Sequence, residues 1–394
     1  MKDKQMLLAG VWEPERIPWP VFSDAAVDFL AALSEEILHS PLRRTPEIAA
    51  FGFWCRRARL EQLKRRHECA QERMGRGVVF HIAPSNVPMM FAYTYAIGLL
   101  AGNANIVRLS DRSPEESLSL CRVMYTVLQR PEFSGVRQRT ALIRYPREDA
   151  ITAEYVAHCD ARVVWGGDAT VRSLRAMPMP AHAVELTFPD RWSLACFSRR
   201  SMSEKTDDEL RELAHRFYND TYLMDQNACS SPQLIAWVDD GGPEETRERW
   251  WRAVAEEAVR EYDLSAYRVA RKYERLCLAV MDEPNVARVT RYCGNRLYVA
   301  SLSGLPEQPV DRLRGGFGFF FEAEVESLRV LLPLLGEKVQ TLCVEGFDKE
   351  ALIRELVENH VLGVDRIVPL GQAMEMDTVW DGKDLIASLS RMIQ

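Results

Sequence analysis

Residues 77–197 alternate apolar segments typical of β-strands with segments typical of helices, and the turns between them are short. Strand-like segments occupy 78–83, 104–109, 140–145, 162–165, 183–188 and 193–197, and helix-like segments occupy 89–101, 151–158 and 169–177. A further helix is expected after Ser113-Pro114-Glu115-Glu116, which has the composition of a capping box. Such alternation implies an α/β fold in which helices cover both faces of a parallel sheet.

Ligands of parallel sheets bind at the carboxyl ends of the strands, which predicts where a ligand site lies. Three turns fall at that edge: Ser85-Asn86, Ser110-Asp111 and Gly166-Gly167. No G-x-G-x-x-G motif supports dinucleotide binding, and a lone Gly-Gly is a weak signal of phosphate approach. These turns therefore indicate a ligand edge without naming its ligand.

A second α/β region is expected around Cys229, which lies in a turn of small residues. An amphipathic helix at 207–222 precedes this turn, and a strand at 233–238 follows it. Further along, helices are predicted at 244–262 and 349–359, and strands at 276–280, 296–302, 317–321 and 339–344. A turn cysteine between helix and strand is a candidate nucleophile, because it can face a cleft beside backbone N–H groups.

Residues 1–75 are expected to be helical, with one helix starting at Ser23-Asp24 and a second, arginine-rich helix at 55–74. The basic residues of the second helix have two interpretations. They form an anion site for a cofactor phosphate or an acidic carrier, or they form a solvated face paired with Glu61, Glu68 and Glu72.

Charge and cysteine usage limit the class of protein. The net charge of −7, with Lys and Arg interspersed among Asp and Glu, argues against a nucleic-acid binder. No apolar run is long enough for a membrane span, and no signal peptide is seen. The nine cysteines lack C-x-x-C spacing, so we expect reduced thiols in a cytoplasmic protein and no metal site.

Several motifs of this chain together resemble the aldehyde dehydrogenase superfamily. Within it, the chain resembles the acyl-CoA reductase family of the bacterial luminescence fatty-acid reductases. The resemblance is carried by Val79-Phe80-His81-Ile82-Ala83-Pro84-Ser85-Asn86-Val87-Pro88, the segments 98–107 and 164–167, Asp225-Gln226-Asn227-Ala228-Cys229-Ser230-Ser231-Pro232-Gln233, and the segments 336–342, 363–371 and 380–382.

This resemblance implies a Rossmann-type, parallel-sheet cofactor domain and a second α/β catalytic domain. We expect an N-terminal helical segment at 1–75, a nicotinamide cofactor domain at 76–223, and a catalytic domain at 224–365. A tail at 366–394 would follow as a possible oligomerisation segment of a homodimer or homotetramer.

The resemblance also implies roles for single residues. Cys229 would attack an acyl thioester, and the amide of Asn86 with the backbone N–H of Cys229 would hold the oxyanion. Glu185 stands where the superfamily has a Glu-Leu-Gly-Gly motif, but Thr187 and Phe188 replace the glycines, so its role is proton transfer or purely structural. His81 lies in an apolar strand and is interpreted as a core histidine.

Cofactor contacts are implied for a further set of residues. Arg108 stands where the superfamily has a lysine that meets the adenosine ribose, and its planar fork favours NADPH, although NADH is possible and a strand-end salt bridge is the alternative. A glutamate that positions the nicotinamide ribose would be Glu322, Glu324 or Glu326, with a preference for Glu324. The remaining predicted contacts are Pro84, Ser85, Ser110, Gly166 and Gly167.

The expected activity is reduction of an acyl thioester, carried by CoA or an acyl carrier protein, to an aldehyde through a thioacyl intermediate on Cys229. Two alternatives remain at this point. One is an acyltransferase or thioesterase that uses the same cysteine without hydride transfer, and the other is a non-catalytic acyl-binding subunit.

Overall fold

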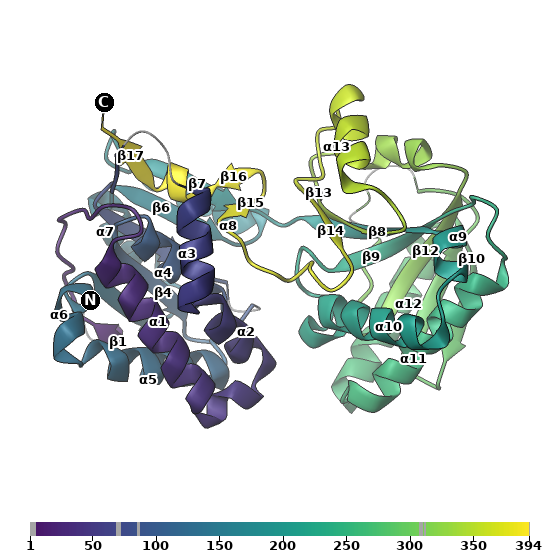
Figure 1. Ribbon diagram of the computed structural model, residues 1–394, viewed down its shortest axis with the longest axis horizontal. Helices are drawn as coiled ribbons and strands as arrows, with labels where there is room; N and C mark the ends of the chain where they lie inside the picture. The colour runs from purple at the N-terminus through teal and green to yellow at the C-terminus, as the bar shows by residue number, and fades with distance from the viewer. Residues whose placement is uncertain (1–4, 68–71, 85–86, 307–309, 311–312, 394) are drawn as a thin grey trace. The chain divides into compact units, whose positions relative to one another are not determined.

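The computed structural model describes residues 5–67, 72–84, 87–306, 310 and 313–393. They form two compact units, one made of residues 1–189 with 376–394 and the other of residues 190–375. The boundary predicted at residue 224 falls within the second unit, because the strand at 192–198 belongs to the second unit's sheet. Each unit contains a largely parallel sheet between helices, which confirms the α/β fold (Figure 1).

The sheet of the first unit has six strands in the order β1-β5-β4-β3-β6-β7. Only β1 is antiparallel to its neighbour, and the remaining pairs are parallel. The strands agree with the predicted alternation, except that β1 was not foreseen. Their bounds are β1 Met6–Gly10, β3 Val78–Ile82, β4 Ala104–Ser110, β5 Thr140–Tyr145, β6 Ala161–Trp165 and β7 Val184–Phe188.

Helices cover both faces of this sheet. On one face α1 to α5 bury their apolar side chains against Val79, Val107 and Leu142. On the other face α7 and α8 pack against Phe80, Ile106 and their neighbours. The helices are α1 Asp24–His39, α2 Pro46–Trp54, α3 Arg57–Arg66, α4 Met90–Leu100, α5 Glu115–Leu128, α6 Ser134–Arg137, α7 Asp149–His158 and α8 Asp168–Arg175, with short 3₁₀ turns at Pro41–Arg44 and Pro131–Phe133.

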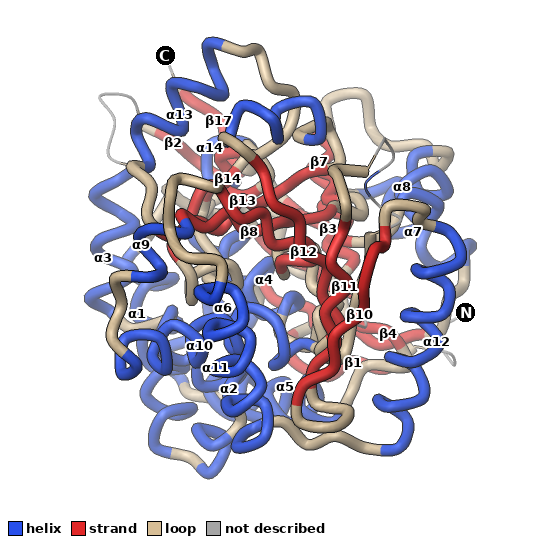
Figure 2. Tube along the Cα trace, turned by 90° about the vertical axis from the view of Figure 1, so that its right-hand side faces the viewer, coloured by secondary structure: helices blue, strands red, loops and turns tan. Residues whose placement is uncertain are grey.

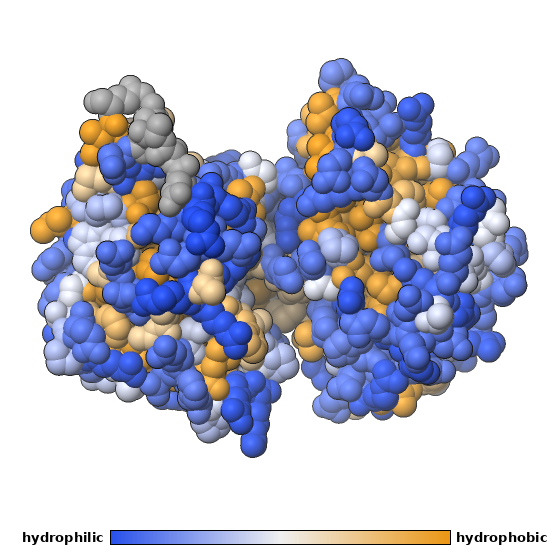
Figure 3. Space-filling model, viewed as in Figure 1, coloured by the Kyte–Doolittle hydropathy of each residue, from blue (hydrophilic) through white to orange (hydrophobic). Residues whose placement is uncertain are grey.

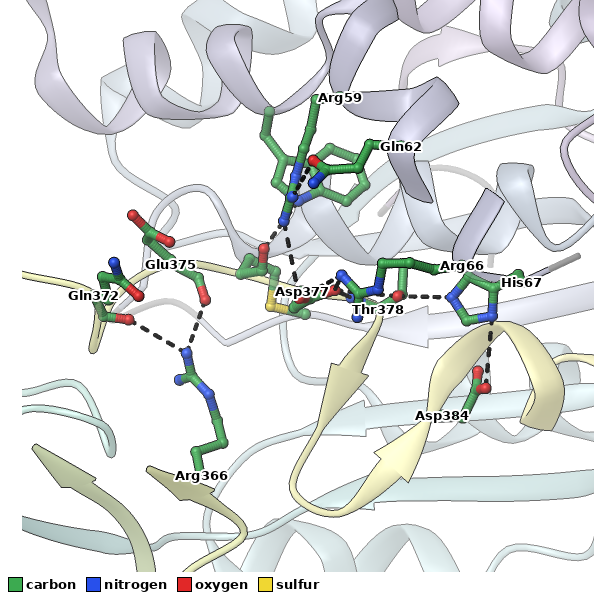
Figure 4. A network of polar contacts seen from close by, with 12 residues as sticks. Arg59, Gln62, Arg66, His67, Arg366, Gln372, Glu375, Asp377, Thr378 and Asp384 are labelled. Atoms are coloured by element: carbon green, nitrogen blue, oxygen red, sulfur yellow. Dashed lines mark hydrogen bonds and ion pairs between the residues drawn. The ribbon is translucent and has the colours of Figure 1, made fainter. Parts of the chain in front are cut away.

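The basic helix predicted at 55–74 is shorter than expected, because α3 ends at Arg66. Figure 4 shows Arg59 and Arg66 of this helix beside Asp377, with Arg66 Nη1 2.9 Å from its carboxylate. Arg57 pairs with Asp28 in the same unit. These ion pairs favour the solvated, paired face over an anion site. The predicted capping box is also wrong, since Pro114 itself occupies the N-cap of α5 and no side chain caps it.

Residues 376–394 complete the first unit. The strand β17 Ser390–Met392 pairs antiparallel with β2 Arg73–Gly75, and the indole of Trp54 donates to the carbonyl of Met376. His67 contacts the hydroxyl of Thr378, as Figure 4 shows. This segment also contains the small hairpin β15 Val379–Trp380 with β16 Lys383–Asp384, and α14 Leu385–Ser388.

The sheet of the second unit has seven strands in the order β10-β11-β12-β9-β8-β13-β14. The edge strand β10 is antiparallel to β11, and the other pairs are parallel. Figure 2 shows β10 beside β11 in this sheet. The bounds are β8 Trp192–Ser198, β9 Pro232–Val238, β10 Val286–Tyr292, β11 Leu297–Leu302, β12 Phe319–Val325, β13 Val339–Glu345 and β14 Arg366–Pro369.

Alternate side chains of these strands enter two cores. Phe197, Trp237 and Phe320 pack against α10 and α11 on one face, and Leu194, Leu234 and Phe321 pack with α13 on the other. The helices are α9 Arg199–Ser203, α10 Asp207–Thr221, α11 Glu245–Glu261, α12 Ala266–Asp282 and α13 Lys349–Glu358, with 3₁₀ turns at Tyr222–Met224 and Leu328–Leu334.

The strand predicted at 276–280 is wrong, because these residues form the last turns of α12. Ser265 caps that helix by accepting from the backbone N–H of Arg268. Its helical period is hidden in the sequence because large apolar side chains such as Tyr273 and Met281 remain exposed.

The surface and the helices carry two further observations. In the view of Figure 3, both units show mostly hydrophilic residues with smaller apolar areas among them. Within the described ranges, no helix combines the length and the apolar character needed to cross a lipid bilayer.

Candidate active site

Cys229 lies in the second unit, in the loop between the 3₁₀ turn Tyr222–Met224 and β9. The structure therefore confirms a turn cysteine between helix and strand. Parallel pairing places Pro232 of β9 opposite Ser193 of β8, and Trp192 opposite Val339 of β13. The residues that precede these three strands consequently gather at one edge of the sheet, which is the edge of their amino ends.

The backbone of the Cys229 loop is held in an unusual conformation. Asp225 and Gln226 both have a positive φ, 51° and 57°, a conformation that aspartate tolerates but that is costly for glutamine. The buried amide of Gln226 stabilises it, since Nε2 donates to the carbonyl of Phe319 at 3.0 Å and Oε1 accepts from the N–H of Gly318 at 2.8 Å. This anchoring fixes the loop on β12.

The loop is anchored on β8 and β9 as well. Ser193 Oγ donates to the carbonyl of Cys229 at 2.6 Å and accepts from the N–H of Thr341 at 3.1 Å. Gln233 Nε2 donates to the carbonyl of Gln226 at 3.0 Å, and Ser231 Oγ donates to the carbonyl of Asp220 at 2.8 Å. The position of the Cys229 backbone is thus set by strands on both sides.

The thiol of Cys229 is partly exposed, whereas the other described thiols are either buried or, for Cys277 and Cys293, exposed. Cys55, Cys121, Cys159, Cys196 and Cys343 are buried, and burial raises the pKa of each of these thiols. Cys229 is only partly buried, and its Sγ lies 3.5 Å from the backbone nitrogen of Arg191, which donates to it. Partly exposed thiols with nearby donors and cations are the reactive class.

A carboxylate also contacts this thiol. Asp190 Oδ1 lies 3.7 Å from Sγ of Cys229, within the range of an S–H···O hydrogen bond. The guanidinium of Arg314 holds both oxygens of Asp190, at 3.2 and 2.8 Å, and Lys338 Nζ donates to the Asp190 carbonyl at 3.2 Å. Cys229, Asp190 and Arg314 thus form a contiguous polar cluster, which we call the Cys229 cluster.

Asp190, Arg314 and Lys338 were missed by sequence reasoning. Asp190 and Lys338 each precede a strand that neighbours β9 or β8, so the order of strands brings them to Cys229. The strand order brings Lys338 to Asp190, which is 148 positions away in the sequence, and no local motif reveals such a contact. The sequence signal that could have indicated these residues is a charged side chain shortly before a predicted strand, as Asp190 and Lys338 are.

The three candidate glutamates lie on β12 or, for Glu326, directly after it. Glu322 is buried and accepts from Trp251 Nε1 and Ser301 Oγ, both at 2.7 Å. Glu324 pairs with Arg199 and Arg247 and is opposite Trp237, near the carboxyl end of β9. Five residues of strand from Pro232 to Trp237 correspond to about 16 Å, so the structure does not bring Glu324 to the Cys229 edge.

Glu185 lies on β7 of the first unit and is held by two arginines. Arg162, which is buried, donates to Oε1 from Nε at 3.1 Å, and Arg175 Nε lies 2.8 Å from Oε2. A carboxylate with both oxygens in ion pairs stabilises its strand and the helix α8. This geometry supports the structural alternative for Glu185.

The predicted cofactor residues of the first unit meet at one edge of its sheet. Pro84 follows β3, Arg108 and Ser110 end β4, and Gly166 and Gly167 follow β6, and these three strands are neighbours. An added Cβ on Gly167 would meet no atom within 4 Å, so open space lies above the start of α8. The predicted residues Ser85 and Asn86 lie outside the described residues.

Arg108 has the properties expected of an anion ligand. Its Nη2 donates to the carbonyl of Tyr145 at 3.1 Å, while its Nε is buried and has no hydrogen-bond partner among the described atoms. Burial lowers the pKa of its guanidinium, and no carboxylate in the described ranges forms an ion pair with it. The strand-end salt bridge that was the alternative is therefore not formed there, and an unpaired buried donor fits a phosphate group.

His81 is confirmed as a core histidine. It is fully buried, with Nδ1 2.8 Å from Thr94 Oγ1 and Nε2 2.9 Å from Asn105 Oδ1, and burial lowers its pKa to about 4. Within the described ranges, no group of three or more His, Cys, Asp or Glu side chains is placed to hold a metal ion.

Comparison with known proteins identifies relatives of this arrangement. The family described as "Acyl-CoA reductase (LuxC)" matches residues 32–262, which is more than half of the chain. The chain is 26% identical over 175 residues to "Long-chain acyl-protein thioester reductase" of Vibrio harveyi, covering 44% of this chain and 34% of that protein. It is 24% identical over 174 residues to "Long-chain acyl-protein thioester reductase 2" of Photobacterium leiognathi, with the same coverage of 44% and 34%. The aligned segments thus span about a third of the length of these relatives.

Solved structures with a similar fold are aldehyde dehydrogenases. Lactaldehyde dehydrogenase from Escherichia coli superposes with a TM-score of 0.60 at 11% identity, over 94% of this chain and 84% of that chain. A 1-pyrroline-5-carboxylate dehydrogenase variant from Thermus thermophilus gives 0.61 at 12% identity, over 94% and 80%. These similarities confirm the aldehyde dehydrogenase fold, and the family match shows that the chain belongs to the acyl-CoA reductase (LuxC) family.

Proposed function

We propose that this protein is an oxidoreductase that converts an acyl thioester to an aldehyde through a thioacyl intermediate on Cys229. The observation that carries the proposal is the partly exposed Cys229 thiol, held by a rigid loop beside a backbone N–H donor and a carboxylate. The acyl-protein thioester reductases among its relatives support a protein-bound acyl donor, and the family description supports an acyl-CoA.

The residues of the second unit would perform the acyl transfer. The sulfur of Cys229 attacks the thioester carbon with loss of its proton, and the acyl group moves to the enzyme while the carrier thiol leaves. The backbone N–H of Cys229 is our proposed donor to the oxyanion, and one donor of this kind is typically worth about 3 kcal/mol in the barrier. Anchoring of the loop by Gln226 and Ser193 keeps the nucleophile in place without a reorganisation cost.

The first unit would bind the nicotinamide cofactor. Arg108, with its unpaired buried Nε, and the open start of α8 after Gly167 fit the phosphates of a dinucleotide. When bound, the reduced nicotinamide supplies the hydride that converts a thioacyl group to an aldehyde. We propose a preference for NADPH over NADH because a guanidinium fork binds a phosphate in a bidentate manner.

Intact-protein mass spectrometry tests the proposal directly. Wild type, Cys229→Ala and the control Cys277→Ala, which removes an exposed thiol on α12, are mixed with a panel of acyl-CoAs and acyl carrier protein thioesters. We expect an acyl adduct on wild type and on Cys277→Ala but none on Cys229→Ala. Addition of NADPH should discharge the adduct as an aldehyde.

Other outcomes lead to different functions. An adduct that neither NADPH nor NADH discharges would support an acyltransferase or thioesterase. Absence of an adduct with every donor would leave only an acyl-binding role and would refute the proposed reaction.

A further inference from the structure

Asp190 is the carboxylate in contact with the sulfur of Cys229. Its Oδ1 lies 3.7 Å from Sγ, and its side chain is 46% exposed, so water and substrate can reach it. A negative charge beside a thiol disfavours the thiolate, so stabilising the thiolate cannot be the task of this carboxylate. Accepting a proton from the thiol is a task that suits its position.

The neighbours of Asp190 offset its charge and fix its direction. Arg314 binds both of its oxygens, at 3.2 and 2.8 Å, and the same guanidinium donates to the carbonyl of Arg191 at 3.1 Å. Bidentate pairing fixes the plane of a carboxylate. The Arg191 N–H, 3.5 Å from Sγ, stabilises negative charge on sulfur once the proton has left.

Resting on the function proposed above, we propose that Asp190 is the catalytic base of the acylation step and that Arg314 is its positioning residue. Asp190 Oδ1 takes the proton of the Cys229 thiol as the sulfur lone pair forms the new S–C bond to the acyl carbon. The carbon–sulfur bond of the donor then breaks, and its electron pair remains on the departing carrier sulfur. Asp190 returns the proton to that thiolate, so the step yields the thioacyl enzyme and a free carrier thiol.

This role places the groups that perform acylation in the second unit. The base, the nucleophile and the positioning arginine all lie in residues 190–375, so acylation depends on groups of the second unit. Glu185, which resembles the superfamily's general base, is engaged by Arg162 and Arg175 on the first unit. The cluster therefore supplies a base that the sequence motif alone does not identify.

Two rates measured on Asp190→Asn separate catalysis from loop structure. The first is acylation by the acyl donor that labels wild type, followed by intact mass, and the second is alkylation of Cys229 by iodoacetamide, both from pH 6 to 9. We expect acylation at pH 7 to fall by about 100-fold, the lower range for loss of a general base. Alkylation should be as fast as in wild type or faster, because a neutral amide opposes the thiolate less than a carboxylate does.

Two further variants complete the test. Asp190→Glu keeps a proton acceptor and should acylate faster than Asp190→Asn. Asp239→Asn is the control: Asp239 follows the carboxyl end of β9, away from Cys229, and forms an ion pair with Arg199. This variant should acylate at the wild-type rate. Acylation of Asp190→Asn within twofold of wild type, a parallel loss of acylation and alkylation, or equally slow Asn and Glu variants would each overturn the role of Asp190. Failure of wild type itself to form an adduct would instead refute the proposed function.

Discussion

Acidification is expected to destabilise the first unit through His81. The ring lies in a chain of hydrogen bonds that is complete only when the imidazole is neutral. The Asn105 amide donates to the carbonyl of Asn103 at 2.9 Å, which leaves its Oδ1 to accept from His81 Nε2. His81 Nδ1 then accepts from Thr94 Oγ1, which in turn accepts from the indole of Trp165 at 3.2 Å.

The size and sign of the effect follow from the pKa of His81. Burial lowers this pKa from 6.5 to about 4, so folded His81 stays neutral at pH 5 while an unfolded histidine takes up a proton. The stabilisation is therefore full above pH 6.5 and is lost as the pH falls towards 4. Linkage gives a loss of about 2 kcal/mol in unfolding free energy between pH 7 and pH 5.

Hydrogen exchange of the β3 and β4 amides, measured by mass spectrometry at pH 7 and pH 5, reports opening of this unit. The intrinsic exchange rate at each pH is divided out, and wild type is compared with His81→Gln. Glutamine offers one donor and one acceptor and does not titrate, so the variant should lack the His81 share of the pH dependence. An equal change in opening free energy for both proteins would refute the reasoning.

Three further predictions concern single residues. Arg108→Ala should lower the kcat/KM for NADPH by about tenfold or more while changing that for NADH less, and an unchanged cofactor ratio would remove Arg108 from the cofactor argument. Gly98→Ala should lower the melting temperature although alanine favours helices, because its Cβ would lie 2.1 Å from Asn105 Oδ1, and a higher melting temperature would contradict this packing. Asp220→Asn should cost about 1–3 kcal/mol in denaturant unfolding, because Asp220 accepts the N–H groups of Gly371 at 2.6 Å and Ala373 at 2.9 Å. Burial also raises the pKa of Asp220 to about 7, so between pH 4 and 7 the folded protein keeps a proton that an unfolded aspartate has lost. The unfolding free energy of wild type should therefore fall as the pH rises from about 4 to 7, and that of the Asn variant should lack this slope.

Local patterns predicted what depends on local chemistry. The period of apolar residues located β3 to β9 and the helices α4, α7, α8 and α10 to within about two residues, because each of these elements is specified by its own sequence. The short helices α6 and α9 were not predicted. The same reasoning failed for α12, where several large apolar side chains are exposed to solvent, and for the cap of α5, where proline takes the position expected for serine.

The Cys229 cluster shows why part of the site could not be predicted. Cys229 could be predicted as the candidate nucleophile because its turn and its motif are contiguous in sequence. Asp190 and Arg314 approach it only through the lateral order of β13, β8 and β9 and the loop before β12. That order is decided by packing over long sequence separations, which a single sequence does not express.

The return of residues 376–394 to the first unit has a consequence for biosynthesis. The second unit is an insertion, and all of its strands leave the ribosome before β17 does. The second unit therefore has every strand of its sheet without residues 376–394, whereas β2 lacks its partner strand β17, and Trp54 lacks the carbonyl of Met376, until those residues are present. The first unit would then be the last part of the protein to close, and a chain truncated before residue 376 and released from the ribosome should keep the Cys229 unit folded and leave the first unit protease-sensitive.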